Sequence, residues 1–308
     1  MGQAVRTAVA AALAAWCAAP VTAALAEDDF CGTTQQRIAE GGATIQLLFG
    51  NDDRDTQNSS RYPWSAIGLL ATPLNSCSGT LVGDAVVLTA AHCVTDYLLG
   101  AIAVSDIHFY AGYQDRHMVA DAAALDVVVA PGYVPSHDGP MSPPSTDWAF
   151  VLLDRPIGER AGTIPVRDLD EDALYYAARG RWGRISQGGY SIDQPDHLSA
   201  HVDCRVTGYH DGGWLEHRCD TVPGDSGSPL FVERDGGTFV FAVASAMHCV
   251  RDGEAVSNSA ADARAFFDTY QMLVAGRSGT AAAPPPAVVS RPTASGPRIV
   301  RICENGPC

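Results

Sequence analysis

The sequence predicts an all-β protein of antiparallel strands followed by one C-terminal helix. Short apolar runs rich in β-branched and aromatic residues are separated by Gly, Pro, Asn and Asp, a pattern typical of strands joined by turns. The clearest runs lie at 66–70, 85–88, 127–129, 150–153 and 239–243. Later in the chain, one helix face is indicated by Ala261, Ala265, Phe266, Tyr270 and Leu273. A second, short helix is expected around 173–178.

The N-terminus has the composition of an export signal. Arg6 precedes an apolar run at 8–20, and Ala24-Leu25-Ala26 has the small-residue pattern of a signal-peptidase site. The run is shorter than the ~20 residues that a membrane-spanning helix needs. We therefore expect residues 1–26 to be a signal peptide, and the protein to be secreted or periplasmic without membrane insertion.

The charge balance excludes one class of partner. The chain has 308 residues, and its 20 basic residues, all arginine, stand against 35 acidic ones, for a net charge of −15. This composition offers no basic footprint for a phosphate backbone, so no nucleic-acid partner is expected. The hydrophobic content of 46% is that of an ordinary globular protein.

The composition changes after Gly276. An Ala/Pro-rich stretch at 281–286 predicts a semi-extended linker, and residues 276–308 are expected to form a linker and a cysteine-containing tail. A disordered tail closed by a small Cys303–Cys308 loop is the favoured interpretation. The alternative is a docking tail tied to the body through one of these cysteines.

Nine cysteines in an exported chain point to disulfides. Cys17 is expected to leave with the signal peptide, and an even number then remains. Cys77 and Cys93 flank a histidine, so a bond between them would hold the histidine loop against the preceding strand. A Cys31–Cys249 bond would tether the N-terminal segment to the body.

Three short motifs together indicate nucleophilic catalysis. His92 follows an apolar strand in Thr89–Cys93, Asp147 directly precedes the apolar strand at 148–153, and Ser226 lies in Gly224-Asp225-Ser226-Gly227. Each motif alone has an ordinary structural explanation, whereas His, Asp and Ser in this chain order and these settings are the parts of a serine-protease triad. Two rival aspartates, Asp106 and Asp126, precede no comparable strand.

From about Tyr62 to Val274 the chain resembles secreted trypsin-like serine proteases with the chymotrypsin fold. The resemblance rests on the segments 78–82, 88–93, 147–149, 180–183 and 224–229. Three further segments, at 52–54, 62–68 and 219–221, resemble the bacterial branch that includes glutamyl endopeptidases. The resemblance implies two packed six-stranded antiparallel β-barrels with the site between them, in a protease domain at 48–275. It also implies protein or peptide substrates and a monomer.

The expected roles follow from the chemistry. A serine hydroxyl is a poor nucleophile near neutral pH, so Ser226 needs His92 as its base. Asp147 would fix the imidazole tautomer, and the backbone N–H groups of Gly224 and Ser226 would form the oxyanion hole. A Cys204–Cys219 bond would restrain the nucleophile loop. No cofactor or metal is expected, since the spacing around His210 and His217 is not that of metal ligands.

Substrate preference is left with two alternatives. Asp220 lies six residues before Ser226, where tryptic enzymes carry the carboxylate that binds Arg or Lys, and Ser245 and Met247 would line the same pocket. His248 could instead favour an acidic residue, although the histidine of glutamyl endopeptidases sits earlier on this strand. Arg or Lys is the preference expected first.

The start of the active chain is also left open. Residues 27–47 are expected to form a pro-segment. Cleavage between Arg37 and Ile38 would free an amine to pair with Asp225, as in trypsin zymogens, whereas the bacterial branch indicates a start near Gln46 to Leu48. The second start is slightly favoured. The alternative functions are a catalytically silent, protein-binding family member and an enzyme that processes mainly itself.

Overall fold

The structure is a computed structural model and describes residues 48–49, 51–96, 98, 100–135, 142–251, 254–277, 299–303 and 306–307. The predicted signal peptide, the pro-segment up to residue 47 and most of the tail lie outside these residues. The same holds for Cys31 and Cys308, and for the side chains of 246–256 and 299–303. These predictions, and the disulfides proposed for those cysteines, therefore stay predictions.

The first half of the described chain forms a closed antiparallel barrel with the strand order β2-β3-β4-β9-β8-β7. Its strands are β2 (Ile67–Ala71), β3 (Ser76–Gly83), β4 (Val86–Thr89), β7 (His108–Ala111), β8 (Ala120–Val129) and β9 (Ala149–Leu153). Large apolar side chains such as Ile67, Leu81, Phe109 and Phe150 are fully buried inside it. The barrel closes around Phe109 because Gly68 leaves room: a Cβ there would lie 2.4 Å from the ring.

The second half forms a curled antiparallel sheet of ten strands, in the order β1-β11-β10-β14-β15-β16-β13-β12-β17-β18. Its first five strands along the chain are β1 (Arg54–Thr56), β10 (Arg184–Gly189), β11 (Ser199–Val202), β12 (Val206–His210) and β13 (Trp214–His217). The others are β14 (Pro229–Arg234), β15 (Gly237–Arg251), β16 (Glu254–Asp262), β17 (Ile299–Cys303) and β18 (Gly306–Pro307). The sheet curls over its own core, which includes Ile185, Leu215 and Phe241.

This second sheet differs in one respect from the six-stranded barrel that was expected. Its strands β11 and β12 do not pair with each other, because β11 pairs with β1 and β12 pairs with β17. Segments near both ends of the chain thus supply the outer partners. The mostly β, antiparallel fold class with a C-terminal helix is confirmed.

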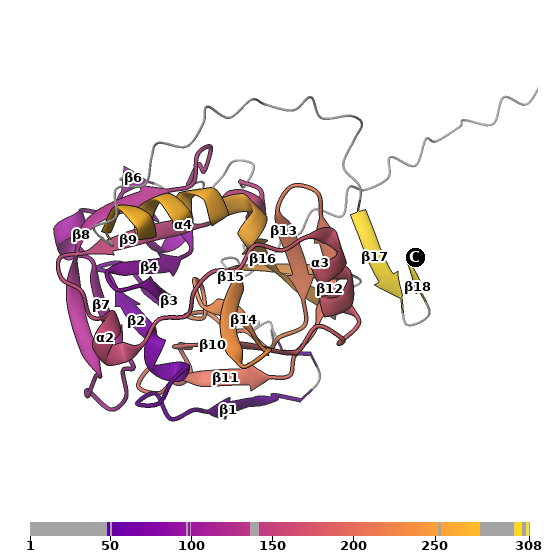
Figure 1. The fold of residues 1–308 in the computed structure, drawn as a ribbon, viewed down its shortest axis with the longest axis horizontal. Coiled ribbons are helices and arrows are strands. Elements are labelled where there is room, and N and C mark those ends of the chain that lie inside the picture. The colour runs from indigo at the N-terminus through magenta and orange to yellow at the C-terminus, as the bar shows by residue number, and fades with distance from the viewer. Residues whose placement is uncertain are drawn as a thin grey trace, which may run out of the picture. The chain divides into compact units, whose positions relative to one another are not determined.

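In the part of the chain that the structure describes, three helices accompany the sheets. α4 (Ala263–Arg277) lies over the first barrel (Figure 1), and Phe266 on it contacts the rings of Trp148 and Phe150. α3 (Glu171–Ala178) matches the short helix expected at 173–178, and the Asp170 side chain caps it by accepting the Ala173 N–H. α2 (Gly158–Ala161) is a single turn that the sequence pattern did not indicate. None of the helices in the described ranges is long and apolar enough to cross a membrane.

Short elements complete the connections. Single 3-10 turns occur at Trp64–Ala66, Ala91–Cys93, Val104–Asp106 and Pro144–Thr146. A two-residue strand pair, β5 (Thr95–Asp96) with β6 (Gly100–Ala101), follows the turn that carries His92. Two of these turns, at Ala91–Cys93 and Pro144–Thr146, bring the predicted catalytic histidine and aspartate to the same end of the first barrel, next to β4 and β9.

Candidate active site

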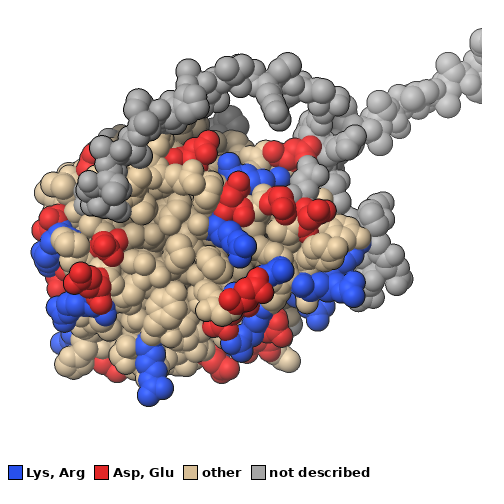
Figure 2. All heavy atoms as spheres, viewed as in Figure 1, with Lys and Arg blue, Asp and Glu red and all other residues tan. Residues whose placement is uncertain are grey.

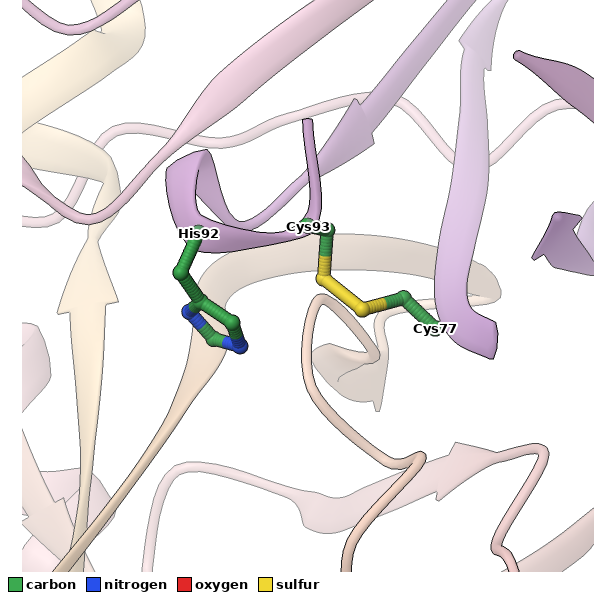
Figure 3. A group of neighbouring side chains, drawn as sticks. All are labelled: Cys77, His92 and Cys93. Carbon is green, nitrogen blue, oxygen red and sulfur yellow. A yellow bond between two sulfur atoms is a disulfide. The ribbon is translucent and has the colours of Figure 1, made fainter. Parts of the chain in front are cut away.

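His92 is held by a turn and by a disulfide. The buried strand β4 ends at Thr89, and the 3-10 turn Ala91–Cys93 follows at once. The Cys77–Cys93 disulfide, with a Cα–Cα distance of 6.0 Å, joins this turn to β3, as the sequence predicted. Figure 3 shows the imidazole of His92 on the same turn as the disulfide. The ring therefore projects from a backbone segment that is fixed at both ends.

Asp147 lies at the end of the turn that precedes β9, and it is 6% exposed. Its Oδ2 is 2.8 Å from His92 Nδ1, and its Oδ1 accepts the backbone N–H of His92 at 3.0 Å. Ser245 Oγ donates a further hydrogen bond of 2.6 Å to Oδ2. Because Asp147 accepts at Nδ1, His92 Nε2 is left to face a substrate or nucleophile.

Burial and ion pairing act against each other in this pair. Burial lowers the pKa of His92, but the charge of Asp147 and its hydrogen bond outweigh burial, and the pKa of His92 is raised above its ordinary value. Burial raises the pKa of Asp147, but His92 and the Ser245 hydroxyl lower it by more, so the net shift is downward. Asp147 is therefore an ionised carboxylate, and the imidazole is a stronger base than a free one.

The loop that carries Ser226 depends on two glycines with positive φ. Gly224 has φ +99°, and a Cβ there would lie 2.5 Å from the Tyr190 carbonyl oxygen. Gly227 has φ +80°, and a Cβ there would lie 2.2 Å from Thr89 Oγ1 and 2.4 Å from the Ser78 carbonyl oxygen. Only glycine fits the backbone conformation at both positions, together with the close approach of Tyr190 at Gly224 and of the first barrel at Gly227.

Ser78 of the first barrel joins the two sheets at this loop. Its Oγ donates to the Gly224 carbonyl at 2.9 Å and accepts the Tyr190 N–H at 2.8 Å. Its N–H donates to the Ser226 carbonyl at 2.8 Å, and its carbonyl accepts the Thr89 hydroxyl at 2.8 Å. This fully buried serine is the centre of the contact between the barrel and the nucleophile loop.

Ser226 is placed beside the histidine turn. Its carbonyl oxygen lies 3.6 Å from Cys93 Sγ, and the residue is 7% exposed. Within the described residues, Ser226 Oγ makes no hydrogen bond to His92, a geometry that free enzymes often show before substrate binds. The N–H groups of Gly224 and Ser226 donate to no group in the described part of the chain, so both can receive an oxyanion.

Asp225 is buried and has partners that the sequence did not indicate. Its Oδ1 accepts the Ser191 hydroxyl at 2.7 Å and its Oδ2 accepts the Val222 N–H at 2.9 Å. Arg54 Nη1 donates to the same Ser191 oxygen at 3.0 Å. Burial raises the pKa of Asp225 to about 6, against these hydrogen bonds and the charge of Arg54.

The guanidinium of Arg54 is itself buried in an acidic setting. It pairs with Asp52 at 2.8 Å and with Asp193 at 2.7 Å. Sequence analysis placed Arg54 only within a segment typical of the bacterial branch. The available signal was an arginine between aspartates next to the start of the domain.

Asp220, predicted to bind substrate, is fully buried and engaged with the N-terminal segment. Its Oδ1 accepts the Phe49 N–H at 2.8 Å and its Oδ2 accepts the Asp53 N–H at 2.9 Å. Its own N–H donates to His201 Nδ1 at 3.0 Å. Burial raises the pKa of Asp220, but the adjacent His201, whose Nδ1 lies 3.2 Å from Oδ2, and the N–H groups of Phe49 and Asp53 outweigh it and the net shift is downward.

Of the other predicted residues, Cys204, Cys219 and Ser245 have side-chain contacts in the structure, and Met247 has none that is described. Cys204 and Cys219 are bonded, with a Cα–Cα distance of 4.9 Å. Ser245, expected to line a pocket, donates to Asp147 instead. Met247 lies on β15, and its side chain is outside the described residues.

Among the described residues, two groups of side chains have the proximity that a metal site requires. Cys77, His92 and Cys93 form one group, but its two sulfurs are bonded to each other and offer no thiolate. The other group is Asp53, His201 and Asp220, where both Asp220 oxygens and His201 Nδ1 already accept hydrogen bonds from N–H groups. These contacts account for both groups without an ion.

The two sheets, the His92–Asp147 pair and the serine loop between them define a protein of the chymotrypsin-like fold class. A solved structure of Glu endopeptidase in complex with MPD has the same fold, with a TM-score of 0.60 over 74% of this chain and 99% of that chain, at 22% sequence identity. The model of the family described as Trypsin matches residues 51–266. The chain belongs to the trypsin family.

The curated relatives are longer than the parts that match this chain. Glutamyl endopeptidase of Bacillus licheniformis is 35% identical over 65% of this chain, which spans 59% of that protein. Trypsin-like protease of Streptomyces glaucescens is 29% identical over 53% of this chain and 62% of that protein. Serine protease filzig of Drosophila melanogaster is 25% identical over 59% of this chain, but only 12% of that protein. The chain thus spans less than two thirds of each of these relatives.

Proposed function

We propose that this protein is a secreted serine endopeptidase, made as a zymogen, that hydrolyses peptide bonds through an acyl-enzyme on Ser226. The observation that supports this most is the buried Asp147 carboxylate, which holds His92 Nδ1 at 2.8 Å beside the Ser226 loop. Membership of the trypsin family agrees with this chemistry. Protein or peptide substrates and a monomeric state belong to the same proposal.

The proposed reaction follows the geometry. His92 Nε2 takes the proton of Ser226 Oγ while that oxygen bonds to the substrate carbonyl carbon. The N–H groups of Gly224 and Ser226 stabilise the resulting oxyanion. His92 then gives the proton to the leaving amine nitrogen as the C–N bond breaks, and a water molecule releases the acyl group by the reverse roles. Asp147 stays ionised throughout and holds the imidazole.

A fluorophosphonate probe tests the central claim. We expect the purified mature protein to be labelled at Ser226, with Ser226→Ala and His92→Ala showing no labelling. An unlabelled, folded wild type would instead support a catalytically silent, protein-binding member. Comparison of N-terminal processing in wild type and Ser226→Ala tests the self-processing alternative, because a self-processing enzyme would leave the variant uncut.

For substrate preference, we propose that Asp220 anchors the N-terminal segment and that the preferred residue is not Arg or Lys. Both Asp220 oxygens accept backbone N–H groups, which weighs against the tryptic role expected from its sequence position. Glutamate is the first residue to test, because the Bacillus licheniformis relative is named a glutamyl endopeptidase. Digestion of a peptide library decides this, and cleavage after Arg or Lys alone would overturn it.

For activation, we propose that the mature chain starts near Gln46 to Leu48. In trypsin zymogens the residue corresponding to Asp225 receives a newly freed amine, but here Ser191 and the Val222 N–H already hold it. The Phe49 N–H is bound to Asp220, so a start shortly before Phe49 keeps this contact. N-terminal sequencing of active protein is the test, and a start at Ile38 would contradict the proposal.

A further inference from the structure

One cavity among the described residues lies outside the catalytic groups that were predicted. It has a volume of about 1060 Å³ and is partly open to solvent. Four arginines line it, at positions 179, 181, 205 and 218, and we call it the arginine cavity. In Figure 2 basic side chains lie next to acidic ones on the surface around α3, the helix that ends just before Arg179. This concentration of arginines at one cavity is unexpected in a chain with a net charge of −15.

These arginines have no acidic partner among the described residues. None of the four forms an ion pair there. The Arg179 guanidinium lies 3.4 Å from the centre of the Tyr175 ring, and Arg218 lies 5.0 Å from that of Phe49. Aromatic rings orient a guanidinium while leaving its N–H edge free for an anion.

The fold brings two of these charges together. Arg205 follows Cys204 and Arg218 precedes Cys219, so the disulfide places both arginines at its ends. The Arg218 N–H also donates to the Arg205 carbonyl at 2.8 Å. Arg205 directly precedes β12 and Arg218 directly follows β13, so two like charges are held next to each other at the end of this strand pair, and a bound anion would reduce their repulsion.

Two buried polar atoms at the cavity also lack partners. Arg179 Nη1 and Thr207 Oγ1 are buried and accept or donate no hydrogen bond within the described part of the chain. Both residues line the arginine cavity. Buried polar groups are normally satisfied, so this pair indicates a place where a ligand or water is expected to bind.

We propose that the arginine cavity binds the carboxylates of an acidic polypeptide segment supplied by another protein. Its volume exceeds that of a single small anion. Its apolar wall includes Ile185 and Val206, and the aspartates Asp53 and Asp203 also line it. These carboxylates would repel a densely charged polyanion, but they can accept backbone N–H groups of a peptide. Arginine matches carboxylates with two parallel hydrogen bonds.

Net charge does not prevent such binding. At physiological ionic strength exposed charges are screened beyond roughly 8 Å, so the acidic groups elsewhere on the molecule act weakly at the cavity. The local arginines therefore decide the sign of the interaction. Added salt is expected to weaken binding, since the contacts are charge pairs at a partly open surface.

The test measures binding without hydrolysis. A Glu peptide is also a candidate substrate of the proposed peptidase, so the arginine variants described below, and not binding alone, decide whether the cavity is the binding site. Full-length Ser226→Ala protein is titrated into a fluorescein-labelled peptide of alternating Glu and Gly, and anisotropy is recorded. A peptide of the same length with Gln in place of Glu is the uncharged control. We expect saturable binding of the Glu peptide and weaker binding of the Gln peptide by roughly tenfold or more.

Variants locate the site. Arg205→Gln with Arg218→Gln is expected to weaken binding roughly tenfold or more, while Arg160→Gln, an exposed arginine on α2, leaves it unchanged. If the double variant fails to fold, the exposed Arg181→Glu replaces it. Unchanged affinity in a folded arginine variant overturns the proposal. Competition by inorganic phosphate as strong as that by unlabelled Glu peptide would also overturn it, since the site would then be one for small anions.

Discussion

Asp147 shows how a buried carboxylate is kept ionised. Three hydrogen bonds reach it, from the His92 ring, the His92 backbone and the Ser245 hydroxyl. Burial raises the pKa of Asp147, but the charge of His92 and these hydrogen bonds outweigh it and the net shift is downward. The charge of Asp147 and its hydrogen bond in turn raise the pKa of His92 against burial. The arrangement therefore has two measurable consequences for the proposed peptidase.

The first consequence concerns how the rate of the proposed peptidase depends on pH. The base must be neutral to accept the serine proton, and Asp147 raises the pKa of His92 above its ordinary value of 6.5. We expect kcat/KM to rise with pH and to reach its midpoint above pH 6.5, which a pH–rate profile measures. Asp147→Asn is expected to lower the rate by about 10⁴. A midpoint below 6.5 would contradict the geometry.

The second consequence concerns the hydrogen bond from Ser245 to Asp147. Ser245→Ala removes one hydrogen bond to an ionised group, and we expect kcat/KM to fall roughly tenfold with KM nearly unchanged. Ser65→Ala is the matched control, because Ser65 is also buried but donates to the Ala161 carbonyl. Steady-state kinetics compare the two. Equal losses of activity would show that Ser245 acts through general stability.

Asp225 differs from Asp147 because its partners do not offset burial. Its pKa is raised from 3.8 to about 6, so the folded state binds a proton more readily than the unfolded chain between these values. Stability due to this group therefore falls as pH rises from 4 to 6.

Asp225→Asn removes this titration. A shift of two pKa units corresponds to about 3 kcal/mol. Between pH 4 and pH 7 we therefore expect the free energy of unfolding of the variant to rise by roughly that much relative to that of the wild type. Urea unfolding of both proteins at the two pH values measures it. A difference between the proteins that does not change with pH would contradict the proposed ionisation.

Among the structural elements, the loop that carries Ser226 leaves little room for a larger residue. Gly227 and Gly236 both have positive φ, but a Cβ on Gly236 would meet nothing within 4 Å, whereas one on Gly227 would clash with Thr89 and Ser78. Alanine variants at the two positions therefore distinguish the cost of backbone strain alone from the added cost of a clash between the sheets.

Gly236→Ala is expected to destabilise the protein by roughly 1–2 kcal/mol through its left-handed backbone. Gly227→Ala carries the same strain and a steric clash, so we expect a larger loss and no fluorophosphonate labelling. Thermal unfolding and probe labelling report the two effects. Similar unfolding temperatures for both variants would show that the loop can move away from the barrel.

The central strands were predictable, and the outer ones were not. Runs such as 150–153 and 239–243 became β9 and β15 because their side chains fill a core, and burial is visible in composition. β1 (Arg54–Thr56) is polar, and it is a strand because it pairs with β11, far away in the chain. No local pattern encodes such a pairing, and the closed second barrel was expected from the family resemblance alone.

The whole chain lacks lysine, so its α-amine is its one primary amine. An amine-reactive ester should therefore place a single label on each mature molecule, at its first residue. We expect mass spectrometry of the labelled peptide to report a start near residues 46–48. A label on Ile38 would support the trypsin-like activation alternative.

Motifs identified the candidate catalytic residues, but not what supports them. His92, Asp147 and Ser226 stand in short segments with specific neighbours, and the structure brings the first two into contact. Arg54, Ser191 and Ser78 were missed because their roles come from contacts across the chain. Asp220 has the sequence position of a specificity residue, yet its partners belong to the N-terminal segment, and only the folded chain shows that.

The four hydrogen bonds of Ser78 have a mechanical consequence. Two of them end on Gly224 and Ser226, so the barrel and the curled sheet cannot hinge apart without pulling on the nucleophile. The same hydrogen bonds therefore connect the two halves and hold the loop that carries Ser226. A strain applied anywhere along that joint is transmitted to the serine, and an acyl group held on the serine should in turn stiffen the whole molecule against opening.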